Sequence, residues 1–171
     1  MIALTARSPK SARIFCATFV LISILGCFSG AKVVFAGEAR YPLATFNLPK
    51  MEIDIEDGEI DMLATFTLGA GSSGIDLAKD EISLQVKGRS GAYSVTIPGG
   101  SFKADRGGVF KFLGTINKVK LDAALRPVRG GGFEFEIETE GANLKGFSNP
   151  VTVNLTIGDN GASKTVKAEI E

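Results

Sequence analysis

Carboxylates crowd around an Asp57-Gly58 pair in the first half of the chain: Asp54, Glu56, Asp57, Glu59 and Asp61. Oxygen atoms gathered on a turn are the ligands that Ca²⁺ takes, and the ion needs about six to eight of them. The spacing of these acids is not that of a known calcium-binding loop. Asp-Gly between two strand patterns is also a strong hairpin signal, and charged residues at a hairpin tip are mostly solvated. We therefore expect a solvated turn, with a calcium site as the alternative.

A second set of carboxylates alternates along one stretch of the chain: Glu134, Glu136, Glu138 and Glu140. Residues two apart on a β-strand share a face and lie about 6.6–7 Å from each other. Glycosidases use two carboxylates that are about 5–10 Å apart, so this spacing is compatible with a carboxylate-based hydrolase. A regular row is more typical of a solvent-facing strand surface. We expect it to form cross-strand ion pairs with a basic residue of the preceding strand: Lys118, Lys120 or Arg126.

Two long connections stand out among otherwise short ones, Gly69 to Glu81 and Gly141 to Asn149. Long loops often hold ligand contacts, and the first contains several oxygen-bearing side chains: Ser72, Ser73, Asp76, Asp80 and Glu81. The second loop has a different set in their place: Asn143, Lys145 and Asn149. An acidic site is therefore not repeated, and we expect both loops to cover the open ends of a β-sandwich.

Several chemistries lack the residues that they need. The chain has no histidine, which removes the commonest metal ligand and every Ser-His or Cys-His nucleophile. Its two cysteines, Cys16 and Cys27, both lie near the N-terminus. No Gly-x-x-x-x-Gly-Lys phosphate loop is present. The sequence therefore predicts no catalytic, cofactor-binding or metal-binding residue, and no cofactor.

The N-terminal 36 residues have the three-part pattern of a secretory signal. A basic segment with Arg7, Lys10 and Arg13 precedes an uncharged apolar run over residues 14–31. Small residues before a cut site predict cleavage after Ala36 or Ala31. Residues 24–27 also resemble a lipobox that would place a lipid on Cys27, and the run is at the lower limit for a retained membrane anchor.

Removal of residues 1–36 changes the charge of the chain. That segment holds four of the 19 basic residues and no acidic residue, so the remainder has 15 basic and 19 acidic residues and a net charge of −4. A nucleic-acid-binding surface is therefore not expected. The mature chain would have no cysteine in an oxidising compartment, so a hydrophobic core must stabilise it without disulfides. We expect an exported protein: periplasmic, secreted or on the cell surface.

The remaining residues, 37–171, predict a single all-β domain. Apolar and polar residues alternate nearly everywhere, and Gly- or Asp-rich turns separate the segments, which is typical of antiparallel strands with one buried face. We expect an antiparallel sandwich or flattened barrel of ten or eleven strands, with Phe110 and Phe112 pointing inward and Lys111 outward. The predicted strands are 42–48, 50–56, 60–68, 82–87, 92–97, 101–104, 109–116, 118–126, 132–140, 150–157 and 162–170.

The two long loops open with the same pattern, which predicts an internal repeat of residues 50–100 in 118–171. Gly-Ala-x-x-x-Gly begins at Gly69 and at Gly141, and an apolar residue follows each, Ile75 and Phe147. The following strands align Ile82 with Val151. Lys-x-x-x-Asp segments at residues 50–54 and 118–122 extend the match backward. We expect equivalent β-units related by an approximate twofold axis, with Ile75 and Phe147 closing the core; a chance likeness of short motifs is the alternative.

From about residue 60 onward the chain resembles an uncharacterised family of bacterial exported β-rich domains. The segments that carry the resemblance are Phe66–Gly71, Gly74–Asp76, Thr96–Lys103, Phe110–Phe112, Gly114–Ile116, Asn149–Val153 and Leu155–Asp159. Relatives often have Gly or Asp where this chain has Lys118. The resemblance implies an exported β-domain, sometimes appended to other proteins, and implies no activity and no site residue.

These observations predict a non-catalytic exported module, structural or binding, with an unknown protein or cell-envelope partner. It would meet a membrane only through the N-terminal segment or a lipid on Cys27. A small-ligand carrier with an enclosed apolar cavity in a β-barrel is the first alternative. A carboxylate-based hydrolase with two acids in a cleft is the second.

Overall fold

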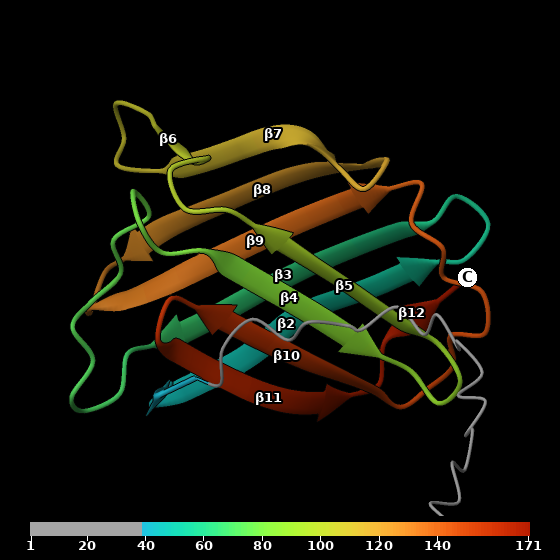
Figure 1. Cartoon of the computed structure of the whole chain (residues 1–171). Helices are drawn as coiled ribbons and strands as arrows, with labels where there is room; N and C mark the ends of the chain where they lie inside the picture. Colours follow the sequence, from blue (N-terminus) through green and yellow to red (C-terminus); the bar gives the residue numbers. More distant parts are fainter. Residues whose placement is uncertain (1–38) are drawn as a thin grey trace, which may run out of the picture. The chain divides into compact units, whose positions relative to one another are not determined.

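The computed structural model describes residues 39–171, and the predicted signal segment with Cys16 and Cys27 lies outside them. These residues form two β-sheets that pack face to face (Figure 1). The sheets are not closed into a barrel, so the prediction of an all-β sandwich is confirmed and its flattened-barrel alternative is not realised. The described residues contain no helix that is long and apolar enough to cross a membrane.

Sheet B has seven strands in the order β12-β2-β3-β9-β8-β7-β6. All its pairs are antiparallel except β12 with β2, which is parallel. Its strands are β2 (Thr45–Asp54), β3 (Glu59–Thr67), β6 (Lys103–Ala104), β7 (Phe110–Ile116), β8 (Val119–Val128), β9 (Gly132–Glu140) and β12 (Glu169–Ile170).

Sheet A has five strands in the order β1-β11-β10-β4-β5. The short β1 pairs with β11 in parallel, and the other pairs are antiparallel. Its strands are β1 (Tyr41–Pro42), β4 (Ile82–Lys87), β5 (Ala92–Ile97), β10 (Val151–Ile157) and β11 (Asn160–Val166).

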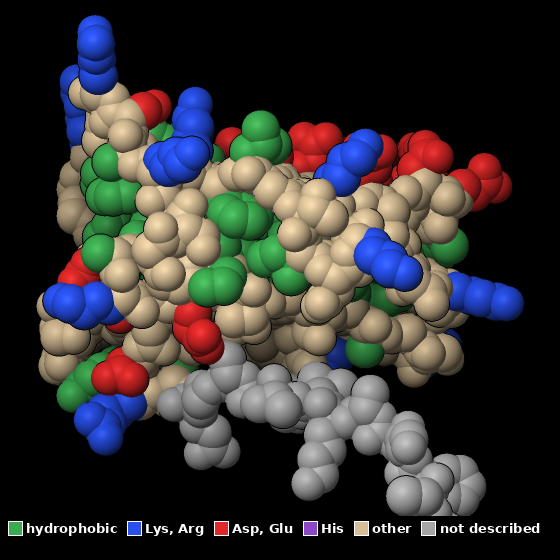
Figure 2. Space-filling view, turned by 45° about the horizontal axis from the view of Figure 1, so that its top comes forward, with side chains coloured by type: hydrophobic (Ala, Val, Ile, Leu, Met, Phe, Trp, Pro, Cys, Tyr) green, Lys and Arg blue, Asp and Glu red, His purple; other side chains and the backbone are tan. Residues whose placement is uncertain are grey.

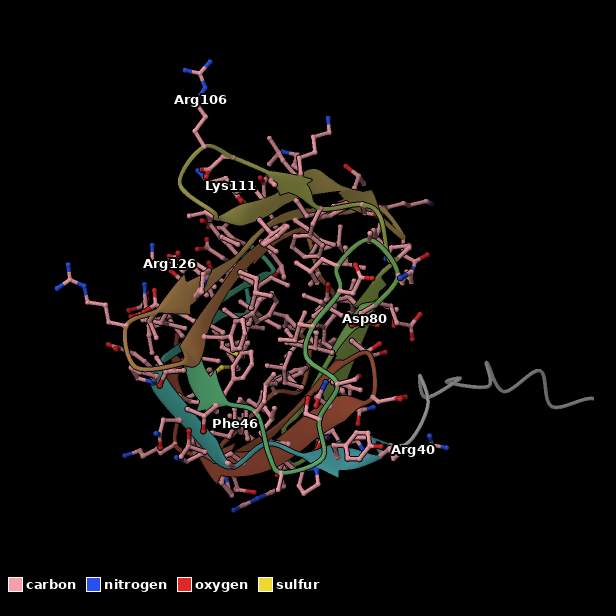
Figure 3. The ribbon with its side chains drawn as sticks, turned by 90° about the vertical axis from the view of Figure 1, so that its left-hand side faces the viewer. Arg40, Phe46, Asp80, Arg106, Lys111 and Arg126 are labelled. Atoms are coloured by element: carbon pink, nitrogen blue, oxygen red, sulfur yellow. The ribbon has the colours of Figure 1, made fainter. Side chains whose placement is uncertain are left out.

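The core lies between the sheets and follows from the two-residue period. In β3, Ile60, Met62, Ala64 and Phe66 are buried, whereas the residues between them face outward. In β10 the same holds for Val151, Val153, Leu155 and Ile157. Seen from the side, side chains from both sheets fill the space between them (Figure 3). The alternation thus decides which face of each strand becomes core.

Some predicted strands have different limits in the structure. The predicted strands 42–48 and 50–56 become β1 and a continuous β2 with an irregular register between Asn47 and Lys50. Pro49 lies at that irregularity, and it has no N–H to donate to a ladder. The predicted strand 162–170 divides into β11 and β12, because the chain crosses from sheet A to sheet B at Lys167 and Ala168. Asn149 holds this crossing, since its side-chain amide both donates to and accepts from the backbone of Ala168 at 2.8 Å.

The two halves of the chain have the same strand arrangement. In each half one hairpin, β2–β3 or β8–β9, lies in sheet B, and the next, β4–β5 or β10–β11, lies in sheet A. The halves meet where β3 pairs with β9 and β4 with β10, both antiparallel. Ile82 pairs with Ile97 as Val151 pairs with Val166, which agrees with the predicted alignment of these strands. This is the arrangement that an internal repeat requires, and the repeat itself stays a prediction.

One part of the predicted repeat does not fit the strands. Residues 50–54 form the end of β2, whereas residues 118–122 lie at the start of β8. The two Lys-x-x-x-Asp segments are therefore not equivalent positions of their hairpins. Their likeness is local, because the same five-residue alternation suits any strand end.

The two long loops close the ends of the sandwich, as predicted. Leu77 in the first loop is buried, and Ile75 is half-buried against the core. In the second loop Phe147 is buried together with Ala142 and Leu144. This second loop also covers the β2–β3 turn, where Ala142 N donates to Gly58 O at 2.9 Å.

The orientation predicted for the β7 phenylalanines is correct, but their burial is incomplete. Phe110 and Phe112 face the core side and Lys111 points outward, yet both rings are only half-buried. Phe102, which is 8% exposed, packs against Phe112 with ring centroids 5.9 Å apart. Phe112→Ala is therefore expected to cost less than the roughly 3–5 kcal/mol that removal of a fully buried phenylalanine costs.

Candidate functional site

The outward face of sheet B is the most distinctive surface of the described chain. Because β2, β3, β8 and β9 turn their apolar residues inward, their intervening residues share the opposite face. Most of the charged residues on this face are acidic: Glu52, Asp54, Glu59, Asp61, Asp122, Glu134, Glu136, Glu138, Glu140, Glu169 and Glu171. The basic residues on the same face are Lys50, Lys103, Lys111, Lys120 and Arg126.

The strand register places five of these acids in one row across five strands. Glu169 pairs with Glu52, Glu52 with Asp61, Asp61 with Glu138, and Glu138 with Asp122. Directly opposed side chains of neighbouring strands lie about 4.5–5.5 Å apart at Cβ. Like charges at that separation repel each other and destabilise a sheet. The five carboxylates therefore concentrate negative charge in one row, and their mutual repulsion destabilises the folded protein.

A single lysine lies against the row. Lys50 Nζ is 2.5 Å from Asp61 Oδ2 and 3.2 Å from Glu52 Oε2. The hydrogen bond to Asp61, with a second to Glu52, holds the pKa of Lys50 above its usual value. Lys50 thus compensates Glu52 and Asp61. Among the described residues, Glu138 and Asp122 form no ion pair.

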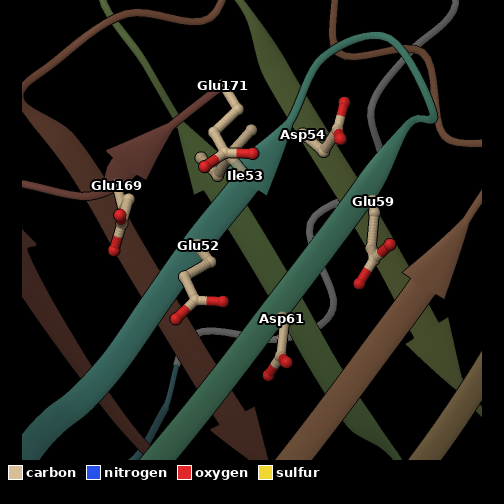
Figure 4. A pocket seen from close by; sticks show the side chains of 7 residues that line it. All are labelled: Glu52, Ile53, Asp54, Glu59, Asp61, Glu169 and Glu171. Carbon is tan, nitrogen blue, oxygen red and sulfur yellow. The ribbon is translucent and has the colours of Figure 1, made fainter.

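An open depression of about 310 Å³ lies over the β12–β2–β3 part of this face. Its lining is Glu52, Ile53, Asp54, Glu59, Asp61, Glu169 and Glu171. Figure 4 shows these carboxylates arranged along neighbouring strands. The depression is thus a part of the acidic face and not a separate apolar pocket.

Glu59, at the start of β3, lies among other carboxylates. Burial raises the pKa of its carboxyl, and the charges of Glu138, Asp61, Asp54 and Asp57 raise it further. A carboxyl whose pKa is raised by folding destabilises the folded state when it is ionised. This penalty appears as the pH rises through the ordinary pKa of about 4.5 toward the folded value, and it is absent below that range.

We therefore expect Glu59→Gln to raise the melting temperature at pH 7. The gain should shrink to nothing as the pH falls below about 4.5, where the wild-type carboxyl is also neutral. Thermal melts of both proteins across about pH 3–7 measure it. A constant difference at all pH values would show that ionisation of Glu59 is not the cause.

The predicted ion pairs of the β9 glutamates are confirmed in part. Lys120 Nζ lies 2.7 Å from Glu140 Oε1, and Arg126 forms an ion pair with Glu134. Lys118 is in the turn before β8, and within residues 39–171 it forms no ion pair. Glu136 and Glu138 face Ala124 and Asp122 instead of a cation. The row of glutamates thus lies on an open sheet face, outside the depression of about 310 Å³, and the hydrolase alternative stays a prediction.

The acidic hairpin tip forms a turn, as predicted. Asp54 Oδ1 accepts hydrogen bonds from the backbone N–H groups of Glu56 and Asp57, at 2.8 and 3.1 Å. Its oxygen is thereby engaged in shaping the turn between β2 and β3. Within residues 39–171, no group of three or more acidic side chains is placed to hold a metal ion.

The acids of the first long loop are also engaged locally. Asp76 Oδ2 accepts from Lys79 Nζ at 2.7 Å, and Asp76 Oδ1 accepts from the N–H of Ala78 at 3.1 Å. These contacts, the lysine first, lower the pKa of Asp76. Asp80 Oδ2 accepts from the N–H of Asp76 at 2.7 Å. The loop therefore uses these carboxylates to order itself as a cover.

Sequence reasoning identified most acids of the face but missed their alignment. Glu169, Glu52 and Asp122 had no assigned role, because alternation gives the face of a residue and not its partner on another strand. Asp61 and Glu138 are opposed only because β3 and β9 pair across a long sequence separation. The regular acidic positions on both strands were the one available signal.

Comparison with known proteins found no matching family model, no similar curated protein and no similar solved structure. The resemblance to exported bacterial β-domains therefore stays a prediction.

Proposed function

We propose that the protein is a non-catalytic exported module that binds a basic partner protein through the outward face of sheet B. The observation that carries this proposal is the row Glu169, Glu52, Asp61, Glu138 and Asp122, with Lys50 as its neighbouring cation. The predicted secretory signal supports export, and the absence of histidine from the sequence supports a binding role over catalysis.

A basic partner would relieve the repulsion among the carboxylates of the row. Carboxylates that repel one another in the free protein gain from a lysine- or arginine-rich surface placed over them. Such an interface would form rapidly by electrostatic attraction and would weaken as salt screens the charges. An open face that spans several strands suits a protein surface better than a small molecule, which is mostly bound in a more enclosed site. The space between the sheets is filled by hydrophobic side chains, so no observation favours the carrier alternative.

The test uses a fluorescently labelled peptide of about ten lysines as a probe, since it has the cationic charge of such a partner. Residues 37–171 are titrated with the probe at low salt, and the fluorescence anisotropy gives the dissociation constant. Glu52→Gln with Glu138→Gln removes two charges from the row and leaves the Lys50–Asp61 pair intact. This double variant is expected to bind at least about tenfold more weakly.

The matched control is Glu81→Gln with Asp159→Asn. It removes the same charge from exposed positions outside sheet B. Its affinity should stay within about twofold of that of the wild type, since only net charge has changed. Equal weakening by both double variants would show a general charge effect and would contradict a binding face on sheet B.

A further inference from the structure

Leu113 of β7 is the most exposed large hydrophobic residue of the described chain. Its side chain is 83% exposed, and the next such residue, Val128, is 37% exposed. Leu113 points away from the core, because Phe112 before it faces the core side. A single exposed leucine is ordinary on a protein surface, so its meaning depends on what lies around it.

The strand register places Leu113 in line with the carboxylate row of sheet B. Leu113 of β7 pairs with Asp122 of β8, which is the last acid of that row. Directly opposed residues of neighbouring strands lie on the same face of a sheet. The row therefore continues from β12 through β2, β3, β9 and β8 to β7, and its last position is apolar instead of acidic.

The row ends at Leu113 because the sheet ends there. β6 pairs with β7 only through Lys103 and Ala104, opposite Lys111 and Phe110. Among residues 39–171, no strand pairs with β7 beyond Lys111 on that side. Figure 2 turns this side toward the viewer and shows acidic side chains along the upper margin, with a protruding hydrophobic side chain next to them. A partner that follows the row thus reaches an apolar spot at its end.

The charge around Leu113 is balanced, whereas the rest of the row is acidic. Three lysines and three carboxylates lie around it on this part of the face: Lys103, Lys111, Lys120, Asp105, Asp122 and Glu140. A further basic side chain placed over Leu113 would therefore gain little attraction. An apolar side chain there would remove the leucine from water, which is favourable. The end of the row thus favours an apolar residue of the partner.

The row has the length of a short peptide segment. Neighbouring strands of a sheet are about 4.8 Å apart, so the steps from β12 to β7 cover roughly 24 Å. An extended chain covers this distance with about seven residues. Such a segment could place basic side chains over the carboxylates and one apolar end over Leu113.

We propose that the row binds a short segment of a partner protein whose basic residues lie over the carboxylates and whose apolar end packs on Leu113. This inference rests on the function proposed for the acidic face, and it specifies the composition of the partner. Opposite charges attract the segment, and the apolar contact at one end fixes its position along the row. Lysines alone would fit the row in several positions.

The probe is a labelled peptide of about six lysines followed by a pair of leucines, which has the length of the row. Its control has the same composition, with the leucine pair between two groups of lysines. Both peptides carry the same charge, so a difference between them reports the apolar contact. The wild type should bind the probe at least about fivefold more tightly than the control. This ratio should persist as salt is raised, because salt screens charges and weakens both peptides alike.

Leu113→Ala should reduce the ratio of the two affinities to about one. Val128→Ala is the matched control, since Val128 is also an exposed hydrophobic residue on the outward face but lies at the end of β8, opposite Gly132 and away from the row. It should keep the ratio of the wild type. Equal binding of the two peptides by the wild type, or an unchanged ratio in Leu113→Ala, would overturn the proposal.

The double variant Glu52→Gln with Glu138→Gln distinguishes this failure from failure of the proposed function. If it weakens both peptides but the wild type binds them equally, the acidic face binds cations and only the role of Leu113 is wrong. If it weakens neither peptide, the proposed function and this inference are both wrong. Concentration-dependent dimers that Leu113→Ala abolishes would also overturn the inference, since a second copy would then cover Leu113.

Discussion

Phe135→Ala is expected to lower the free energy of unfolding by about 3–5 kcal/mol. Phe135 is 0% exposed and lies in β9, in the middle strands of sheet B, opposite Ala64 of β3 and Leu125 of β8. Loss of its ring removes buried apolar surface and leaves a cavity that rigid neighbouring strands cannot close. Denaturant unfolding followed by circular dichroism measures the change.

Leu113→Ala is the control for this substitution. Leu113 lies on β7 in the same sheet but is 83% exposed, so its loss should change the stability by less than about 0.5 kcal/mol. Phe112→Ala should fall between the two, because its ring is half-buried. If Phe135→Ala lowered the free energy of unfolding less than Phe112→Ala does, the core would not lie between the central strands of the two sheets.

Gly58→Ala is expected to cost about 2–4 kcal/mol, the sum of backbone strain and a steric clash. Gly58 has a φ of +69°, which side chains rarely adopt. A Cβ there would lie 2.2 Å from Ala142 O and 2.7 Å from Ala142 N. Since both atoms are backbone, the second long loop would have to move from the β2–β3 turn. Thermal or denaturant unfolding tests the loss.

Gly108→Ala distinguishes the cost of backbone strain from the cost of the steric clash at Gly58. Gly108 has a similar φ of +75°, but nothing lies within 4 Å of a Cβ at that position. Its substitution should therefore cost only the strain, about 1–2 kcal/mol. Equal costs at the two glycines would mean that the loop of residues 141–150 does not pack against the β2–β3 turn.

The fold was largely predictable because burial on one face imposes a period of two residues. β4, β5 and β9 begin and end as the sequence predicts, since each lies between glycine-rich or polar turns. The short parallel strands β1 and β12 were not predictable. Their two-residue ladders depend on where distant strands lie, and no local pattern records that.

The outward face of sheet B was also predictable only in part. The outward position of Glu138 follows from alternation in β9, and ion pairs between its row and a basic residue of the preceding strand were expected. The structure shows which ones form, Glu134 with Arg126 and Glu140 with Lys120. Its opposition to Asp61 and Asp122 follows from the register of three strands. Register is set by the packing of the whole core. A single sequence therefore predicts on which face of its strand a residue lies, but not which residues oppose it on neighbouring strands.

We propose above that the acidic face of sheet B binds a cationic partner. An NMR titration of residues 37–171 with the ten-lysine peptide tests it residue by residue. We expect the largest amide shifts on β2, β3, β8, β9 and β12, near Glu52, Asp61 and Glu138, and we expect them to vanish as salt is added. Shifts centred on sheet A, or shifts that do not respond to salt, would contradict it.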